Sequence, residues 1–357
     1  MFGLFFDVNY LKIEFLNFEL IIVPCSPIGK MMRNLIFVLL TLLLLSCKSN
    51  ISNTNEIKEQ TSDIEIKYAK NFSLTKKENQ YILQILNPIS GEIESSHSID
   101  PSKKYEAISL SATVVGMYAI LEQQSSLKGI SSIDYVFDPT VKSLFNKKQI
   151  LEYGDETSNS IEKIISSKAN TILYSGFGDE FPNQKKLEAL HFTILPIYDW
   201  KETDPLGKAE WIKVIGALTG EMDEANAFFE NVEKEYKRLK KLTESIDERP
   251  TCLSGNLIGD IWYTPASESY VARLMKDAGA KYRYADTKGQ ITLEFSIEQI
   301  LKDNEHTELW INPGYDSKAK IDKLNPHIKH LKCYENIYCY SPNMSMFWEQ
   351  SAAEPHH

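Results

Sequence analysis

Two stretches of this chain alternate short apolar runs with helical patterns, and a long helical stretch separates them. In the first stretch, from about residue 64 to residue 199, we expect strands at 108–111, 128–131, 171–174 and 193–196. Between these strands, the spacing of apolar residues predicts helices at 114–123, 161–167 and 185–190. Strands that alternate with helices in this way predict βαβ units and a mainly parallel sheet.

The stretch from residue 205 to residue 248 has an almost wholly helical pattern. Apolar residues recur every three or four positions from 211 to 218 and from 225 to 242, and Gly220 lies between the two runs. Pro205 and Pro250 mark the two ends. We expect a long connecting helix, whose rise of about 1.5 Å per residue gives it the length of a domain diameter.

The α/β pattern returns after residue 251, and one motif occurs in both α/β stretches. We expect strands at 253–258 and 309–312, and helices at 269–278 and 297–302. Ser-Ile-Glu-x-Ile occurs at 160–164 and again at 296–300, each time about ten residues before a strand. Such a repeat favours duplication, and the alternative is a chance likeness between two amphipathic helices made of common residues. The predicted fold class is α/β, with two Rossmann-like lobes of mainly parallel sheet bridged by a single long α-helix, and a ligand cleft between the lobes.

The N-terminal region has the pattern of a lipoprotein export signal. Met31-Met32-Arg33-Asn34 precedes eleven apolar or small residues, and Leu44-Leu45-Ser46-Cys47 has the form of a lipobox. The apolar run is too short to span a bilayer. Cys47 is therefore the expected lipidation site and mature N-terminus. The alternative is a plain hydrophobic helix with a chance cysteine.

These patterns divide the chain into six parts. The segment before the signal reads as the product of an over-long gene start, and the segment after it is rich in Ser, Asn, Lys and Glu, which is typical of a flexible tether. The expected parts are an extension (1–30), a signal peptide (31–47), a tether (48–61), an N-terminal lobe (62–204), a connecting helix (205–248) and a C-terminal lobe (249–357).

Composition and charge narrow the function classes. Hydrophobic residues make up 43% of the chain and charged residues 25%, as in an ordinary globular protein. A net charge of −10 argues against nucleic-acid binding, which needs a basic surface. In the body of the chain, Cys333 and Cys339 are the closest pair for a disulfide, and unpaired thiols, with Cys252, are the alternative. No C-x-x-C motif supports a structural zinc or iron–sulfur site.

The sequence lacks the motifs of common enzyme classes. It contains no G-x-S-x-G elbow and no phosphate-binding glycine loop. His327 and His330, with the terminal His356 and His357, form the one histidine set that could hold a metal, and solvated loop histidines are the favoured interpretation. We expect a binding protein without catalytic residues. A surface lipoprotein that adheres or senses is the alternative outside transport.

Several strings, in their order and spacing, make the chain resemble the substrate-binding proteins of ABC importers for iron–siderophore complexes, haem or cobalamin. They include Ile108-Ser-Leu-Ser-Ala-Thr, Leu173-Tyr-Ser-Gly-Phe, Trp262-Tyr-Thr-Pro and Phe347-Trp-Glu-Gln, and the resemblance runs from about residue 104 to residue 355. It implies a monomer, tethered outside the cytoplasm by its N-terminal lipid, that delivers a small chelate to a permease dimer with its ATPase. It implies no permanently bound cofactor. The expected ligand is an iron chelate or cobalamin, with haem or a bare transition metal as alternatives.

The ligand of such a protein should contact loops at the carboxyl ends of the strands. Aromatic side chains there suit a large organic chelate, and the scarcity of arginine in these loops favours a neutral or weakly charged one. The tryptophans at 211 and 310 fit a core position instead. The candidate ligand-binding residues are Ser111, Thr113, Tyr135, Tyr174, Phe177, Trp200, Trp262, Tyr263 and Trp348.

The resemblance also implies one surface glutamate on each lobe that docks into arginine pockets of the permease. The matching positions are Glu162 and Glu298, the two glutamates of the repeated motif. One carboxylate per lobe can orient a two-lobed protein on a two-fold symmetric permease through charge-assisted pairs. The alternative is two ordinary solvated helix charges. Relatives normally continue past the position of Pro355 with a closing helix, so we expect a shortened C-terminus.

Overall fold

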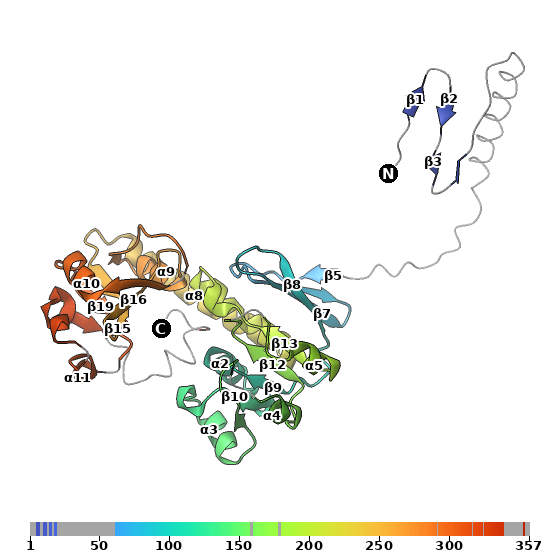
Figure 1. The fold of residues 1–357 in the computed structure, drawn as a ribbon, viewed down its shortest axis with the longest axis horizontal. Coiled ribbons are helices and arrows are strands. Elements are labelled where there is room, and N and C mark those ends of the chain that lie inside the picture. Colours follow the sequence, from blue (N-terminus) through green and yellow to red (C-terminus); the bar gives the residue numbers. More distant parts are fainter. Residues whose placement is uncertain are drawn as a thin grey trace, which may run out of the picture. The chain divides into compact units, whose positions relative to one another are not determined.

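The computed structural model describes four short strands within residues 5–19, residues 61–338 apart from 158–159, 178–179, 291, 316 and 324, and Ala353 (Figure 1). The chain separates into two compact units, Met1–Lys58 and Glu59–His357. The first contains two hairpins, β1 (Phe5–Asp7) with β2 (Tyr10–Lys12) and β3 (Glu14–Phe15) with β4 (Phe18–Glu19). The predicted export signal with Cys47 lies outside the described residues, as does Trp348.

The second unit opens with a four-stranded antiparallel sheet, in which each strand pairs with the next along the chain. Tyr81, Leu83 and Ile85 are buried, with less buried residues between them. This two-residue period is that of a strand with one face on the core. It corrects the expectation that the whole stretch from residue 64 consists of βαβ units. The strands are β5 (Thr61–Asp63), β6 (Phe72–Lys77), β7 (Gln80–Leu86) and β8 (Ile93–Ile99).

The first lobe is built on a five-stranded parallel sheet, in the order β11-β10-β9-β12-β13. Its central strands are continuous apolar runs because helices cover both faces. The strands are β9 (Ala107–Ser109), β10 (Leu127–Ile130), β11 (Leu151–Glu152), β12 (Thr171–Tyr174) and β13 (Thr193–Pro196). The helices are α2 (Ala112–Ile120), α3 (Pro139–Asn146), α4 (Ile161–Ile165) and α5 (Gln184–Ala189), with 3₁₀ turns η1 (Gln124–Ser126) and η2 (Ile133–Tyr135).

The second lobe repeats this frame with a four-stranded parallel sheet in the order β17-β14-β19-β20. Its helices are α9 (Tyr270–Asp277), α10 (Ile297–Asp303) and α11 (Lys318–Ile321), followed by 3₁₀ turns η4 (Pro326–His330) and η5 (Lys332–Asn336). The parallel strands are β14 (Thr251–Ser254), β17 (Lys281–Tyr282), β19 (Leu309–Ile311) and β20 (Ile337–Tyr338). A three-stranded antiparallel sheet is added, of β15 (Asn256–Ile258), β16 (Ile261–Pro265) and β18 (Thr292–Ser296).

The two parallel sheets share one strand order. When the edge strand β11 is left out of the count, the first sheet has the order β10-β9-β12-β13 and the second has β17-β14-β19-β20. In both, the spatial order is second, first, third and fourth strand along the chain. The repeated Ser-Ile-Glu-x-Ile motif begins α4 and α10, and each of these helices precedes the third strand. The predicted two-lobed α/β fold is therefore confirmed, and its topology agrees with the duplication inferred from the motif.

The predicted strand at 253–258 is wrong as a single element. The chain turns at Gly255, whose φ is +108°, so that β14 and β15 belong to different sheets. A Cβ atom at this glycine would lie 2.0 Å from the carbonyl oxygen of Tyr263. Only glycine fits such a close approach of two backbone segments at a positive φ.

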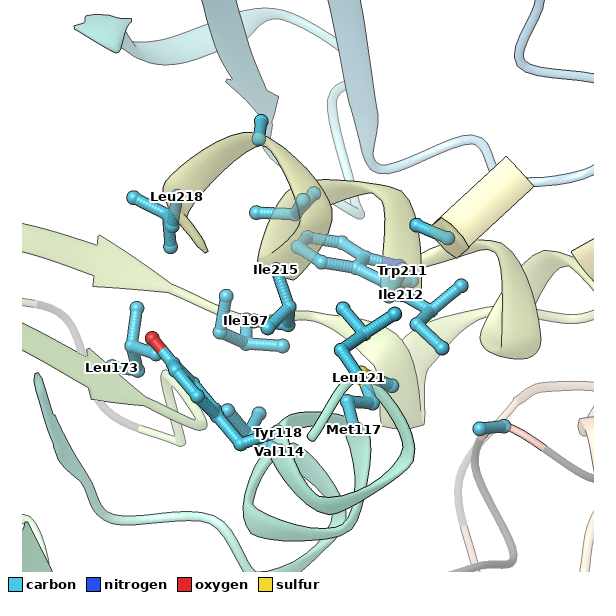
Figure 2. Close-up of a cluster of buried hydrophobic side chains, with 14 of the residues drawn as sticks. Val114, Met117, Tyr118, Leu121, Leu173, Ile197, Trp211, Ile212, Ile215 and Leu218 are labelled. Carbon is cyan, nitrogen blue, oxygen red and sulfur yellow. The ribbon is translucent and has the colours of Figure 1, made fainter. Parts of the chain in front are cut away.

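The helical segment between the lobes consists of three helices. They are α6 (Pro205–Glu210), α7 (Ile212–Thr219) and α8 (Met222–Glu244), and 23-residue α8 is the long helix of the predicted bridge. Gly220 ends α7 in the left-handed conformation, with φ of +82°. The prediction of one continuous helix over 205–248 is therefore wrong, because three helices fill this segment and the long one is α8. Figure 2 shows Trp211, Ile212 and Ile215 facing Met117 and Tyr118 of α2, which places α6 and α7 in the first-lobe core.

Candidate ligand-binding site

Polar side chains from two loops meet at the carboxyl end of the first-lobe sheet. Ser111 and Thr113 follow β9, and their hydroxyl oxygens lie 2.8 Å apart. Thr113 Oγ1 donates to Asp199 Oδ2 at 3.1 Å, and Asp199 follows β13. Burial raises the pKa of Asp199, while the charge of Lys208 and the Thr113 hydroxyl oppose that rise. The structure therefore brings two predicted residues together and adds a buried carboxyl that the sequence analysis had not selected.

An aromatic pair lies at the same end of this sheet. Phe177 follows β12 and is 71% exposed, and its ring centroid is 4.8 Å from that of Trp200. Trp200 lies in the turn η3 (Asp199–Lys201) after β13, and its Nε1 donates to the carbonyl oxygen of Ser175 at 2.7 Å. The hydrogen bond fixes the indole while leaving an aromatic surface that suits the flat faces of an organic ligand.

The loop after β12 folds around a carboxylate that the sequence analysis missed. The amides of Ser175 and Gly176 donate to Glu156 Oε1, the latter at 3.2 Å, and the amide of Phe177 donates to Oε2 at 3.3 Å. Gly176 has a φ of +62°, and a Cβ there would lie 2.4 Å from the ring of Tyr198. Consecutive amides in this conformation form a concave anion-binding nest. The sequence offered no signal, because the partners lie about twenty residues apart.

The two remaining first-lobe predictions differ in exposure. Tyr135 ends the turn after β10 and is 45% exposed. Tyr174 is only 4% exposed, and its ring centroid is 5.1 Å from that of Phe181. Burial raises the pKa of Tyr174, and the charges of Glu94 and Glu156 raise it further. We therefore place Tyr174 in the core beneath the candidate site.

In the second lobe, neighbouring residues of β16 have opposite environments. Trp262 is fully buried, with its ring centroid 5.0 Å from that of Trp310, and its Nε1 donates to the carbonyl oxygen of Ser254. We place Trp262 in the core, which corrects its assignment to the ligand-binding set. Tyr263 points to the other face of the strand and is partly exposed. Three apolar side chains of this lobe are exposed: Ile258 at the end of β15, Ile261 at the start of β16 and Tyr338 at the end of β20.

Contacts join the second lobe to the bridging helices. Lys208 of α6 is 4% exposed, and its Nζ lies 4.3 Å from the ring centroid of Tyr270 at the start of α9. Tyr236 of α8 donates to Asp277 at the end of α9 at 3.1 Å, and Lys240 pairs with the same carboxylate. These buried and half-buried contacts fix α9 against both α6 and α8.

The two glutamates of the repeated motif occupy equivalent positions. Ser160 and Ser296 cap α4 and α10, each accepting a hydrogen bond from the amide three residues on. Glu162 and Glu298 lie at the second position of these helices and are exposed. In both, the residue's own amide and the capping serine lower the pKa of the carboxyl. Each lobe thus presents one ionised carboxylate at the same point of its frame.

The comparisons with known proteins fit this geometry. A family model described as "periplasmic binding protein" matches residues 108–336, which is more than half of the chain. The chain belongs to the periplasmic binding protein family. An uncharacterised lipoprotein of Methanocaldococcus jannaschii is 26% identical over 255 residues. That alignment covers 68% of this chain and 57% of the relative, so the chain spans little more than half the length of this curated relative.

Solved structures of this periplasmic binding protein fold superpose on both lobes. The haem-binding protein HutB of Vibrio cholerae has a TM-score of 0.57 at 12% identity, over 71% of this chain and 98% of its own. A protein described as an ABC-type Fe³⁺-hydroxamate transport system of Saccharomonospora viridis has a TM-score of 0.57 at 17% identity, over 76% of this chain and 96% of its own. At such identities the likeness establishes the fold. Family and fold are those of binding proteins.

The structure of this periplasmic binding protein also bears on the cysteines, the histidines and membrane-spanning helices. Cys252 and Cys333 are buried free thiols, and burial raises their pKa values to about 12 and about 11, while Cys339 lies outside the described residues. Within the described part of the chain, no group of three His, Cys, Asp or Glu side chains could hold a metal. His327 and His330 have ring centroids 5.9 Å apart. Among the helices of the described residues, none is both long and apolar enough to cross a membrane.

A hollow of about 270 Å³ lies between the antiparallel sheet, the segment after β13 and a residue of the second lobe. Lys70, Asn71, Glu202 and Gln290 are among its lining residues. The buried carboxylate of Glu202 accepts hydrogen bonds from the amides of Lys70 and Asn71 and from Nε1 of Trp211. Because Glu202 binds backbone amides and a core tryptophan, we assign it a structural role.

Proposed function

We propose that this periplasmic binding protein captures a metal chelate, a ferric siderophore or cobalamin, and delivers it to the permease of an ABC importer. The observation that carries the proposal is the meeting of Phe177, Trp200, Ser111 and Thr113 at one end of the first-lobe sheet. Loops at the carboxyl ends of parallel strands are the usual ligand sites of α/β folds. Tyr135 in this lobe and Tyr263 in the second lobe complete the proposed ligand-binding set.

The location we propose is outside the cytoplasm, on a lipid attached to Cys47. The family name and the lipoprotein relative support this location. The lipobox supports the anchor itself. Replacing the thiol, in Cys47→Ser, should move the protein from the membrane fraction to the soluble fraction, as judged by fractionation and labelled-lipid incorporation. Retention of lipid by this variant would contradict the proposed anchor.

Ligand binding is tested first by thermal unfolding of the full chain with ferric siderophores, cobalamin and haem. A true ligand at a hundred times its Kd stabilises the folded state by about 2.7 kcal/mol. Stabilisation by haem alone would identify a haem carrier and refute the chelate proposal. No shift with any compound would refute ligand capture of this class.

The aromatic pair is tested by two substitutions of exposed apolar side chains, one at the proposed site and one away from it. Phe177→Ala should weaken binding by more than about 1 kcal/mol, because an exposed aromatic side chain that packs on a ligand behaves as an interface hot spot. Leu242→Ala on α8 removes an exposed apolar side chain of similar exposure, at 59%, and should leave binding unchanged. Equal affinity in both variants would place the ligand elsewhere.

Delivery to the permease is tested through Glu162 and Glu298. The double variant Glu162→Ala with Glu298→Ala should abolish uptake while ligand binding survives, because charge-assisted pairs with arginine need both carboxylates. The control pair, Glu92→Ala with Glu305→Ala, removes one exposed carboxylate from each lobe and should leave uptake intact. Unchanged uptake in the first double variant would refute the docking role.

A further inference from the structure

The nest formed by the amides of Ser175, Gly176 and Phe177 is the strongest unassigned feature at the proposed ligand site. All three amides point at one carboxylate, that of Glu156, which reaches them from the segment after β11. Backbone amides arranged in this way bind anions in many proteins. Here the anion is a side chain of the chain itself.

The surroundings hold the nest in place. Nε1 of Trp200 donates to the carbonyl oxygen of Ser175, and the ring of Trp200 packs on that of Phe177. Beneath the loop, the ring of Tyr198 lies where any side chain at position 176 would have to go. The loop that carries the amides is therefore also held by contacts that do not involve Glu156.

Further negative charge surrounds the nest. The hydroxyl of Tyr198 donates to Glu94 at 2.8 Å, and exposed Glu180 belongs to the same loop as the nest. Two cations lie nearby: Lys201, with its Nζ 4.9 Å from the ring centroids of both Tyr198 and Trp200, and Lys208, whose charge acts on Asp199. A ligand on the Phe177–Trp200 pair would thus meet more carboxylates than cations on this lobe.

We infer that Glu156 is a specificity-determining residue that occupies the nest and thereby selects neutral or cationic chelates over anionic ones. This inference rests on the proposed function, since it concerns the same ligand site. Two effects act together. The carboxylate fills the three donors that an anionic ligand group would need, and its charge repels such a group.

The test compares a neutral ferric trihydroxamate with an anionic ferric tris-catecholate, using the full chain and tryptophan fluorescence. Wild-type protein should bind the neutral chelate at least about tenfold more tightly. Glu156→Gln removes the charge and keeps the shape, so it should lower the ratio of the two affinities, neutral over anionic, about tenfold. Glu156→Ala should lower this ratio at least as far. The control Glu180→Gln removes an exposed charge of the same loop and should change the ratio far less. Tighter wild-type binding of the anionic chelate, or equal effects of the Glu156 and Glu180 variants, would overturn the inference.

A second measurement separates this inference from the proposed function. In protein labelled with ¹⁵N-phenylalanine, the Phe177 amide reports directly on the nest. Inorganic phosphate should shift that signal in Glu156→Ala and leave it unchanged in the wild type. If no chelate binds but phosphate shifts the variant's signal, the proposed function fails while the self-occupied nest stands. If phosphate shifts neither protein's signal, the nest is no anion site and the inference is refuted.

Discussion

The two lobes share a strand order but differ in the fully buried side chains that bind the backbone, which include carboxylates on the first-lobe side and indoles in the second lobe. In the first lobe and the helices after it, carboxylates accept from backbone amides, as Glu210 does from the amides of residues 67–69. In the second lobe, indole groups donate to backbone carbonyls: Trp262 to Ser254, and Trp310 to Gly255 at 2.9 Å. The two lobes therefore share a sheet topology without sharing the side-chain hydrogen bonds that stabilise the backbone around the sheets.

This difference should make the stability of the two lobes respond differently to pH and to changes in packing. A carboxylate gains or loses a proton within the range of ordinary buffers, whereas an indole does not titrate there. The stability of the first lobe should accordingly depend on charge and pH, and that of the second on shape and packing. Three substitutions, each with its own control and taken from the largest expected effect to the smallest, test this contrast.

Removal of the indole in Trp262→Ala should destabilise the protein by about 3–5 kcal/mol, because a fully buried side chain leaves a cavity and the Ser254 carbonyl loses a donor. The neighbouring change, Tyr263→Ala, removes a partly exposed ring and should cost about 1 kcal/mol or less. Urea unfolding followed by circular dichroism measures both. Similar losses in the two variants would contradict the core position of Trp262.

Glu210→Ala should destabilise the first-lobe side by about 3 kcal/mol or somewhat more. The fully buried carboxylate accepts from three amides, and Nζ of buried Lys213 donates to it at 2.8 Å, so the substitution leaves a buried cation without its carboxylate partner. In the control, Glu235→Ala breaks an exposed pair with Arg238 and should cost less than about 1 kcal/mol. Urea unfolding again provides the measurement, and equal losses would mean that the buried contacts contribute nothing beyond a surface pair.

The sequence predicted the parallel strands and the helices of the repeated motif well, and the contacts of the loops that follow the strands poorly. The strands at 171–174 and 193–196 match β12 and β13 residue for residue, since short apolar runs bounded by polar residues are typical of buried parallel strands. The motif glutamates at 162 and 298 also fell at equivalent helix positions. These are local patterns, and local patterns are what a single sequence records.

Several failures depend on contacts between segments that a local pattern does not contain. The turn at Gly255 divides one apparent strand because Tyr263, eight residues on, approaches its backbone. Which of Trp262 and Tyr263 faces the core depends on the pairing of β16 with β18, thirty residues away. Glu156 was missed because its partners are amides, which carry no side-chain signature. The ligand-binding residues themselves remain predictions for the same reason.

The smallest expected effect is a pH dependence that Glu202 imposes on the first-lobe side. Burial raises the pKa of this carboxyl from 4.5 to about 7 in the folded protein, against the opposing hydrogen bonds of Lys70 and Trp211. Because the folded state holds the proton more tightly than the unfolded state, this contribution to stability is complete below pH 4.5. It is lost as the pH rises through about 7. At about 1.4 kcal/mol for each pH unit between 4.5 and about 7, the loss should not exceed about 3 kcal/mol.

Glu202→Gln, which mimics the protonated side chain, should flatten the decline in unfolding free energy between pH 5 and pH 8, roughly the range in which the raised pKa acts. The second lobe offers the matched control. Trp262→Phe lowers stability at every pH but should leave the slope of the wild type, because the indole does not titrate. Urea unfolding of the three proteins at several pH values provides the comparison. If Glu202→Gln keeps the wild-type slope, or Trp262→Phe loses it, the assignment of pH sensitivity to the first lobe is wrong.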